Sequence, residues 1–175
     1  ARGDRVGATQ SAHLAIDLLT EHGNRARLAE AHHLAALLAL GRGQPRAARV
    51  MLDPLISTAR SFSFTNLEML GSSLKLRVAA AMGDANAAEE AMSSPSHTAA
   101  EPTADWRLAL SRWHRSCRHT DAARSLATWT EPKNPAEVFL AIEGARLRLV
   151  AGDLPNATAH IQAAIKMSQK RGYSE

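Results

Sequence analysis

The chain has 175 residues, of which 45% are hydrophobic and only 4% aromatic, and its lysines and arginines exceed its acidic residues by four. That length allows a sizeable core, and the modest basic excess indicates a solvated surface that would also favour an acidic partner or nucleic acid. The single cysteine, Cys117, excludes an internal disulfide, and no run approaches the ~20 apolar residues of a membrane-spanning helix, so we expect a cytoplasmic protein without membrane contact.

Helical patterns fill the first half of the chain, where apolar residues recur at intervals of three and four and strand-favouring residues are few. Helices are predicted over 6–22, from Asn24 to Leu40, from Pro45 onward, over 65–82, and briefly after Asp84. Gly23 and Gly43 mark the ends of the first two, because glycine readily adopts the left-handed conformation that follows a helix. Pro54 cannot donate a backbone hydrogen bond, so we expect the third helix to kink or restart near Asp53.

Residues 93–102, rich in serine and proline, predict a loop, and four further helices are expected after it. Three of these helices carry apolar stripes: Trp106, Leu110, Trp113 and Cys117 on the sixth, Val138, Ile142, Ala145 and Leu149 on the eighth, and Ile161, Ala164, Ile165 and Met167 on the ninth. We interpret Trp106, Trp113 and Cys117 as core side chains. Trp129, near the end of the seventh helix, is a candidate for the rim of a binding surface, and residues 131–135 predict a turn.

A short phrase recurs wherever one helix is expected to end and the next to begin. It reads GQPRAA at 43–48, GDANAA at 83–88, RHTDAA at 118–123 and GDLPNA at 152–157, and its first positions are 40, 35 and 34 residues apart. A period near 34 is typical of stacked helical hairpins, each of which buries its apolar face on its neighbours. We therefore predict an all-α fold of about nine helices in antiparallel hairpins, forming one repeat domain over residues 1–175.

These phrases resemble the tetratricopeptide repeat, in which a turn glycine precedes a small residue by five positions and a bulky residue by nine. The small residues are Ala48, Ala88, Ala123 and Ala157, and the bulky ones are Leu52, Met92 and Ile161, with Ala127 departing in the third repeat. A small residue that lets paired helices approach is present as Ala36, Ser111 and Ala145, whereas Leu76 and the turn residue Arg118 depart from the pattern. The resemblance covers roughly residues 25–172 and implies a superhelical stack of hairpins.

Two segments, 55–65 and 160–175, are similar to the repeats of large bacterial transcriptional activators of the maltose-regulator type, within the LuxR family. In that family a nucleotide-binding switch domain precedes a superhelical sensor domain, and a helix-turn-helix DNA reader ends the chain. The resemblance implies that these residues form a sensor or scaffold segment of a transcriptional regulator. Because the sequence does not begin with methionine, we expect a piece of a longer protein, in which any contact with nucleic acid comes from other domains.

Motifs for catalysis or metal binding are not found in the sequence. It has neither a G-x-x-x-x-G-K-[ST] loop nor an H-E-x-x-H helix, and the adjacent His32 and His33 point about 100° apart on a helix, which makes a shared metal difficult. His114 and Cys117 share a helix face and are good zinc ligands, but no fourth ligand is evident, so a buried thiol is favoured. We therefore expect neither enzymatic activity nor a cofactor.

The densest basic patch in the sequence lies in the sixth and seventh helices. Its members are Arg107, Arg112, Arg115, Arg118 and Arg124. Guanidinium groups grip carboxylates and phosphates, so this patch could hold an acidic peptide or a phosphate. The alternative, which we favour, is a solvated face partly neutralised by Asp105 and Asp121.

Two functions are consistent with these patterns. The first is a binding module whose concave face captures a protein segment, a peptide or a small inducer. By resemblance to the family, the first helix of each hairpin would line that face, with His32, Arg77, Arg107 and Arg146 as candidate ligand contacts. The second is a structural scaffold that links flanking domains or forms a homodimer, which exposed apolar surface on the terminal hairpins would favour.

Overall fold

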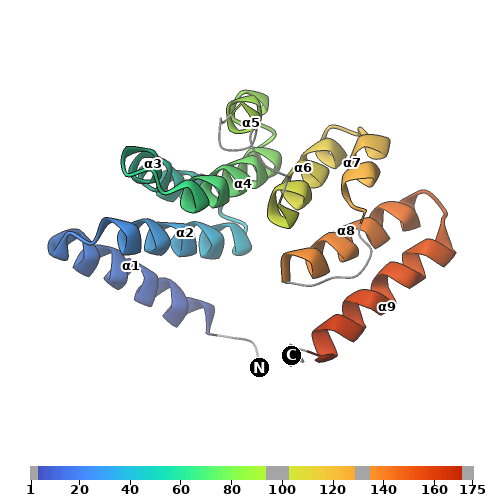
Figure 1. Ribbon diagram of the computed structural model, residues 1–175, viewed down its shortest axis with the longest axis horizontal. Helices are drawn as coiled ribbons and strands as arrows, with labels where there is room; N and C mark the ends of the chain where they lie inside the picture. The colour runs from blue at the N-terminus through green and yellow to red at the C-terminus, as the bar shows by residue number, and fades with distance from the viewer. Residues whose placement is uncertain (1–3, 94–102, 129–134, 171–175) are drawn as a thin grey trace. The chain divides into compact units, whose positions relative to one another are not determined.

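The computed structural model describes residues 4–93, 103–128 and 135–170, which contain nine α-helices and no strand. The helices are α1 (Arg5–His22), α2 (Arg25–Gly41), α3 (Pro45–Ser61), α4 (Thr65–Met82), α5 (Ala85–Met92), α6 (Ala104–Ser116), α7 (Thr120–Leu126), α8 (Pro135–Val150) and α9 (Leu154–Lys170) (Figure 1). The predicted all-α fold is confirmed. Trp129 and most of the two expected loop segments, at 94–102 and 131–134, lie outside the described residues.

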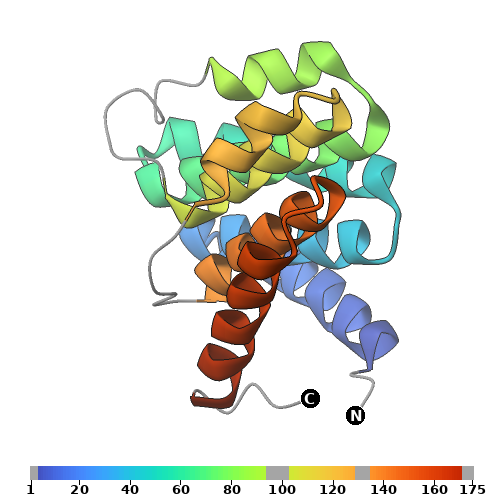
Figure 2. The ribbon, with the colours of Figure 1, turned by 90° about the vertical axis from the view of Figure 1, so that its right-hand side faces the viewer.

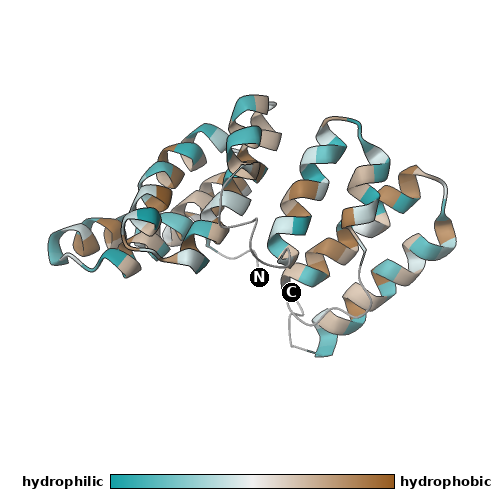
Figure 3. Cartoon of the chain, turned by 45° about the horizontal axis from the view of Figure 1, so that its top comes forward, coloured by the Kyte–Doolittle hydropathy of each residue, from teal (hydrophilic) through white to brown (hydrophobic). Residues whose placement is uncertain are grey.

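The chain divides into two compact units. Residues 1–101 form the first unit, with α1 to α5, and residues 102–175 form the second, with α6 to α9. That the whole chain is one repeat domain stays a prediction. In both units, the helices carry hydrophobic and hydrophilic residues along their length (Figure 3).

Left-handed residues mark the turns between helices. In the first unit they stand 20 residues apart, at Gly23, Gly43, Ser63 and Gly83, with φ angles of 72°, 72°, 54° and 68°. This regular spacing makes α1 to α4 nearly equal in length, at 18, 17, 17 and 18 residues. The three glycines mark helix ends as predicted. The turn at Ser63 carries no glycine, so no residue of this kind indicated it.

Five of the turns share one hydrogen-bond pattern. The backbone N–H just after the left-handed residue bonds a carbonyl five residues earlier: Gln44 to Ala39 at 2.9 Å, Phe64 to Ala59 at 2.8 Å, Asp84 to Ala79 at 3.0 Å, His119 to His114 at 2.8 Å and Asp153 to Arg148 at 2.9 Å. This is the Schellman arrangement, which satisfies carbonyls left unpaired at a helix end. The donating residue is also the last residue before the next helix, so the chain reverses with almost no linker.

In the first unit each helix packs against the next one, and α2 also packs against α4. Leu52, Leu55 and Leu74 form the centre of the core and are at most 1% exposed. The small residues Ala36 and Ala48 are fully buried in the same core, at the positions where the sequence pattern placed small residues. Alanine packing of this kind lets helix axes come close with little side-chain entropy lost.

Pro54 does not divide α3. A single helix runs from Pro45 to Ser61 with Pro54 inside it, so the expected restart near Asp53 is wrong. Proline leaves the carbonyl of residue 50 without its helical partner. Val50 is 64% exposed, so solvent lies close to the turn that loses this bond. The helix therefore continues across the proline because its other side, with Leu52 and Leu55, is fixed in the core.

In the second unit α6 packs against α7 and α8, and α9 runs antiparallel along α8 (Figure 2). Leu140 and Leu147 of α8 join Leu108 of α6 in one cluster, and Val138 and Ala141 of α8 join α9 in another. Ser111 of α6 is fully buried, and its hydroxyl donates a hydrogen bond of 2.9 Å to the carbonyl of Ala123 in α7. The predicted small residue thus stands at the α6–α7 contact, and its hydroxyl is satisfied there.

Only part of each predicted apolar stripe in this unit is buried. Trp106 is 7% exposed, but Trp113 and Cys117 are only half-buried, and Cys117 follows the last residue of α6, so core positions for these two are wrong. On α8 and α9, four stripe residues are exposed: Ile142 at 48%, Leu149 at 49%, Ile161 at 40% and Ile165 at 51%. Helix α8 is apolar on more than one side, so spacing alone did not identify the side that faces the core.

Candidate functional site

A buried carboxylate lies between α6 and α8. Glu143 of α8 is 3% exposed, and its Oε1 accepts a hydrogen bond of 2.6 Å from Nε of Arg115. Nε of Arg112 lies 3.7 Å from the other carboxylate oxygen. Arg112 and Arg115 are one helical turn apart on α6, so both present their guanidinium groups to the same neighbour. A buried carboxylate needs such partners, because leaving it unpaired away from water is costly.

Packing of the surrounding leucines places this carboxylate. Leu140 and Leu147 lie one turn before and after Glu143 on α8, and both pack in the cluster that contains Leu108 of α6. These contacts fix the two helices against each other, so that residue 143 faces the next turns of α6. Glu143 is the only acidic residue in the largely apolar segment 138–149. An acidic residue isolated in this way is the sequence feature that could have indicated a buried carboxylate.

Arg146 adds a third guanidinium one turn beyond Glu143. It is exposed, and within the described ranges it makes no hydrogen bond or ion pair. Burial lowers the pKa of Arg112, Glu143 opposes that change, and the positive charges of Arg115 and Arg146 lower the pKa further. We call Arg112, Arg115, Glu143 and Arg146 the arginine cluster. Two of its three cations pair with the one carboxylate, and the third lies close enough to affect Arg112, so the cluster keeps an excess of positive charge.

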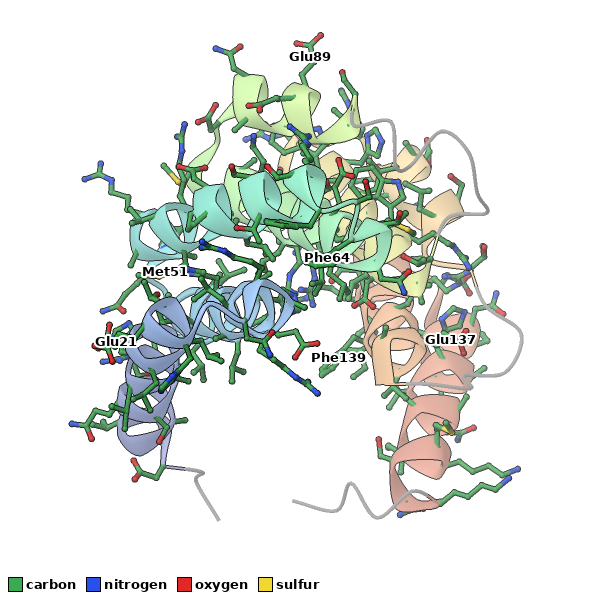
Figure 4. All side chains as sticks on the ribbon, turned by 60° about the vertical axis from the view of Figure 1, so that its left-hand side comes forward. Glu21, Met51, Phe64, Glu89, Glu137 and Phe139 are labelled. Carbon is green, nitrogen blue, oxygen red and sulfur yellow. The ribbon has the colours of Figure 1, made fainter. Side chains whose placement is uncertain are left out.

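This excess gives the cluster the capacity to hold a second anion. Arg112 and Arg115 direct their Nε atoms at Glu143, and their side chains remain 32% and 38% exposed. A guanidinium carries five N–H donors in a planar fork that matches carboxylate and phosphate oxygens. Phe139 lies two turns before Arg146 on the same face of α8 and is 53% exposed (Figure 4). The cluster therefore adjoins an apolar contact point.

The four residues proposed from the sequence as ligand contacts divide between the two units. His32 on α2 and Arg77 on α4 are half-buried in the first unit, whereas Arg107 and Arg146 belong to the second. Nδ1 of His32 is buried without a hydrogen-bond partner, and burial lowers the pKa of this imidazole. Of the four, only Arg146 lies in the arginine cluster.

The side chain of Arg107 donates hydrogen bonds to acceptors at the C-terminal end of α7. Its Nε donates to the carbonyl of Leu126 at 3.2 Å, and its Nη2 donates to Oγ1 of Thr128 at 3.1 Å and to the carbonyl of the same residue. These bonds satisfy acceptors that the helix end leaves unpaired. Arg107 therefore acts as a side-chain cap, and these donors already have partners inside the unit.

The rest of the basic patch is neutralised only in part by the residues that the sequence suggested. Asp121 lies 3.7 Å from Arg124, which is a loose and exposed pair. Arg112 and Arg115 pair instead with Glu143, a residue from another helix. The sequence did not reveal this partner, because about 30 positions separate it from the patch. Arg118 occupies a left-handed turn position with a φ of 63°.

Within the described residues, no three histidine, cysteine or acidic side chains are grouped so that they could hold a metal ion. His114 and His119 have ring centroids 5.9 Å apart. Burial lowers the pKa of His114, and the nearby His119 lowers it further. Both effects keep this ring neutral near neutral pH.

None of the described helices has the length and apolar character needed to cross a membrane. No family model matches the chain, and neither a curated protein nor a solved structure matches it.

Proposed function

We propose that the chain is a non-catalytic, helical-repeat binding module, and that the arginine cluster holds an acidic segment of a protein or peptide partner. The observation that carries this proposal is the partly neutralised cluster, in which Arg112 and Arg115 share the single carboxylate of Glu143 and Arg146 adds an unpaired positive charge nearby. Buried Glu143 orients two of these groups in advance, which lowers the entropic cost of gripping a ligand.

A peptide is favoured over a small inorganic anion because apolar surface adjoins the charge. Phe139 and Ile142, both exposed on α8, lie within two turns of Arg146. A peptide with an acidic residue next to an apolar one would satisfy both features. The sequence resemblance supports a wider role as the sensor or scaffold segment of a bacterial transcriptional regulator, where a small acidic inducer is the alternative ligand.

Fluorescence anisotropy with a labelled peptide of alternating glutamate and leucine tests the site. Arg146→Ala should weaken binding about tenfold or more, since hydrogen bonds to charged groups contribute about 1.5–3 kcal/mol. The matched control is Arg46→Ala, which removes the same charge from an exposed position on α3 in the first unit. Equal effects of the two substitutions would show that only net charge matters, and the proposed site would be wrong.

A second function, that of a structural scaffold, is favoured by a separate observation. Leu149, Ile161 and Ile165 are 40–51% exposed on the last two described helices. Exposed apolar side chains in such a group are typical of protein contact surfaces. A scaffold and a peptide-binding module are compatible, because these side chains are not members of the arginine cluster.

A further inference from the structure

The charge of the arginine cluster is balanced only in part inside the protein. Arg112, Arg115 and Arg146 supply three positive charges and Glu143 supplies one negative charge, and guanidinium groups stay protonated in proteins. Within the part of the chain that the structure describes, Glu143 is the only acidic group among the charges that shift the pKa of Arg112. The cluster therefore has a surplus of two positive charges.

Glu143 contacts each of its two arginine partners through Nε. Nε of Arg115 donates to it at 2.6 Å, and Nε of Arg112 makes the contact of 3.7 Å. Among the described residues no further hydrogen bond is made by either side chain, and both side chains are partly exposed. The N–H groups on Nη1 and Nη2 of both arginines are therefore available to a ligand.

The three guanidinium groups are near enough to influence one another. Arg112 and Arg115 are one turn apart on α6, and Arg146 lies one turn after Glu143 on α8. The positive charges of Arg115 and Arg146 both lower the pKa of Arg112. Repulsion among like charges is relieved most by a compact anion of two charges whose oxygens point in several directions. A carboxylate, with one charge and two oxygens, satisfies the same groups only in part.

We propose that the group held by the arginine cluster is a phosphate monoester, carried by a phosphorylated side chain of the peptide partner. This inference rests on the proposed function and specifies its ligand. A phosphate monoester carries about −1.5 to −2 charges at pH 7 and three acceptor oxygens, so it balances the surplus at one point. Phosphates in nucleic acid carry a single charge each. Phe139, which is exposed on the same face of α8 as Arg146, gives a neighbouring side chain of the peptide an apolar contact.

Fluorescence anisotropy with three labelled peptides tests the identity of the ligand. The peptides share leucine neighbours and differ only in the acidic group, which is a phosphoserine, one glutamate or two adjacent glutamates. The phosphoserine peptide should bind about tenfold more tightly than the single-glutamate peptide, since it makes more hydrogen bonds between charged groups. It should also bind more tightly than the double-glutamate peptide, because its two charges lie on one group.

A change of pH gives a second readout. A phosphate monoester takes up its second proton near pH 6, so affinity for the phosphoserine peptide should fall about fivefold between pH 7.5 and pH 5. The glutamate peptides keep most of their charge over this range, because the pKa of glutamate is about 4.3. Histidines of the same unit, such as His114 and His160, gain positive charge on acidification and strengthen the binding of any anion. The quantity to measure is therefore the ratio of phosphoserine to glutamate affinity, which should fall.

Arg146→Ala removes one charge of the surplus. It should lower the ratio of phosphoserine to single-glutamate affinity from about tenfold to about threefold, because one carboxylate then balances the cluster. The matched control is Lys166→Ala, which removes the same charge from an exposed position on α9 of the same unit and should leave the ratio unchanged. Both substituted side chains are exposed, and circular dichroism melting checks that each variant keeps its fold.

The possible failures separate this inference from the proposed function. A glutamate peptide that binds as tightly as the phosphoserine peptide would overturn the inference and leave the acidic-peptide function intact. Absence of binding by all three peptides would overturn both. Inorganic phosphate that displaces the labelled phosphopeptide as well as unlabelled phosphopeptide does would also overturn both, because it would indicate a site for a free anion. A single-stranded oligonucleotide that displaces the phosphopeptide equally well would overturn both in favour of a nucleic-acid site.

Discussion

In the first unit the charged side chains pair at the surface, whereas in the second unit a carboxylate is buried between two helices. Arg49 and Asp84 form a pair of 3.1 Å in which the arginine is 52% exposed, and Glu143 of the second unit is 3% exposed. The first unit is held by aliphatic side chains that other aliphatic side chains of similar volume could replace. The contact of α6 with α8 depends on specific polar partners, so single substitutions there should have larger effects.

The distribution of tryptophan makes this comparison measurable. The three tryptophans of the chain stand at positions 106, 113 and 129, all within residues 102–175. Urea unfolding followed by tryptophan fluorescence therefore reports on the second unit. Far-ultraviolet circular dichroism reports on the helices of both units. A substitution that acts in one unit should move the corresponding signal more than the other.

The largest effect should come from Gly144, one of two matched buried helical glycines. A Cβ on Gly144 of α8 would lie 2.7 Å from the carbonyl oxygen of Ala127 and 2.7 Å from Nδ1 of His160. Gly144→Ala should destabilise the second unit by about 3 kcal/mol, since overpacking against backbone forces the helices apart. The fluorescence-detected urea midpoint measures this loss.

The matched substitution in the first unit is Gly71→Ala. Its Cβ would meet side chains only, Ile56 at 3.0 Å and Leu55 at 3.3 Å. Alanine gains about 1 kcal/mol over glycine in a helix, which offsets the crowding, so the midpoint by circular dichroism should hardly move. A loss as large as that of Gly144→Ala would contradict the view that the first unit tolerates repacking.

The next largest effect should come from removing the buried charge. Glu143→Gln keeps an oxygen that accepts from Arg115 but leaves two adjacent guanidinium groups without a countercharge. We expect a loss of about 2 kcal/mol, less than for a fully buried pair because both arginines reach solvent. Glu90→Gln is the control: this glutamate lies 2.6 Å from Lys75 and is 65% exposed, so its loss should stay below about 0.5 kcal/mol. Similar losses of stability for the two variants would contradict the view that the buried carboxylate of the second unit matters more than a surface pair of the first.

A smaller gain is expected at the turn between α6 and α7. Arg118 holds a φ of 63° where the corresponding turns carry Gly43, Gly83 and Gly152. Arg118→Gly should stabilise the second unit by about 1 kcal/mol, because the left-handed conformation is costly for residues with a Cβ. Arg118→Ala removes the charge but keeps the Cβ, and it should leave the fluorescence midpoint nearly unchanged. A gain from alanine equal to that from glycine would assign the effect to charge.

The smallest effect should appear on acidification. Burial lowers the pKa of His160, Arg148 lowers it further, and Asp153 together with a hydrogen bond to the backbone of Ala141 opposes the change. The unfolded chain then binds a proton more readily than the folded one. Stability is therefore complete above about pH 6.5, the ordinary value, and falls as the pH drops through the lowered pKa. His160→Gln should reduce the difference between fluorescence midpoints at pH 7 and pH 5, and an unchanged difference would contradict this role.

Much of the helical order was predictable because its signals are local. Turn glycines and the alanines five residues later mark helix ends and close contacts, and Ala48, Ala88, Ala123 and Ala157 are all at most 1% exposed. The start of α4 at Thr65 and its end at Met82 agree with the helix predicted from near Thr65 to Met82 and Gly83. Such features depend on backbone conformation and residue size, and both can be predicted from a short stretch of sequence.

The candidate site was less predictable because its partners are distant in sequence. Arg115 and Glu143 are 28 positions apart in the sequence, and no residue near either of them indicates that they pair. Arg107 was expected to face a ligand, but its donors close the end of α7. The exposed Ile142 and Leu149 share their spacing with the buried Val138 and Ala145. Periodicity identifies a helix but does not say which of several apolar sides a neighbour covers.

The even spacing of left-handed residues in the first unit has a consequence for modularity. Gly43 and Gly83 close equivalent turns, and each is followed by one residue and then a helix. A duplicated cassette of residues 44–83, spliced in after Gly83, would begin at the register that Asp84 now occupies and end on a glycine of its own. The chain could thus be lengthened by whole hairpins without a newly designed linker sequence.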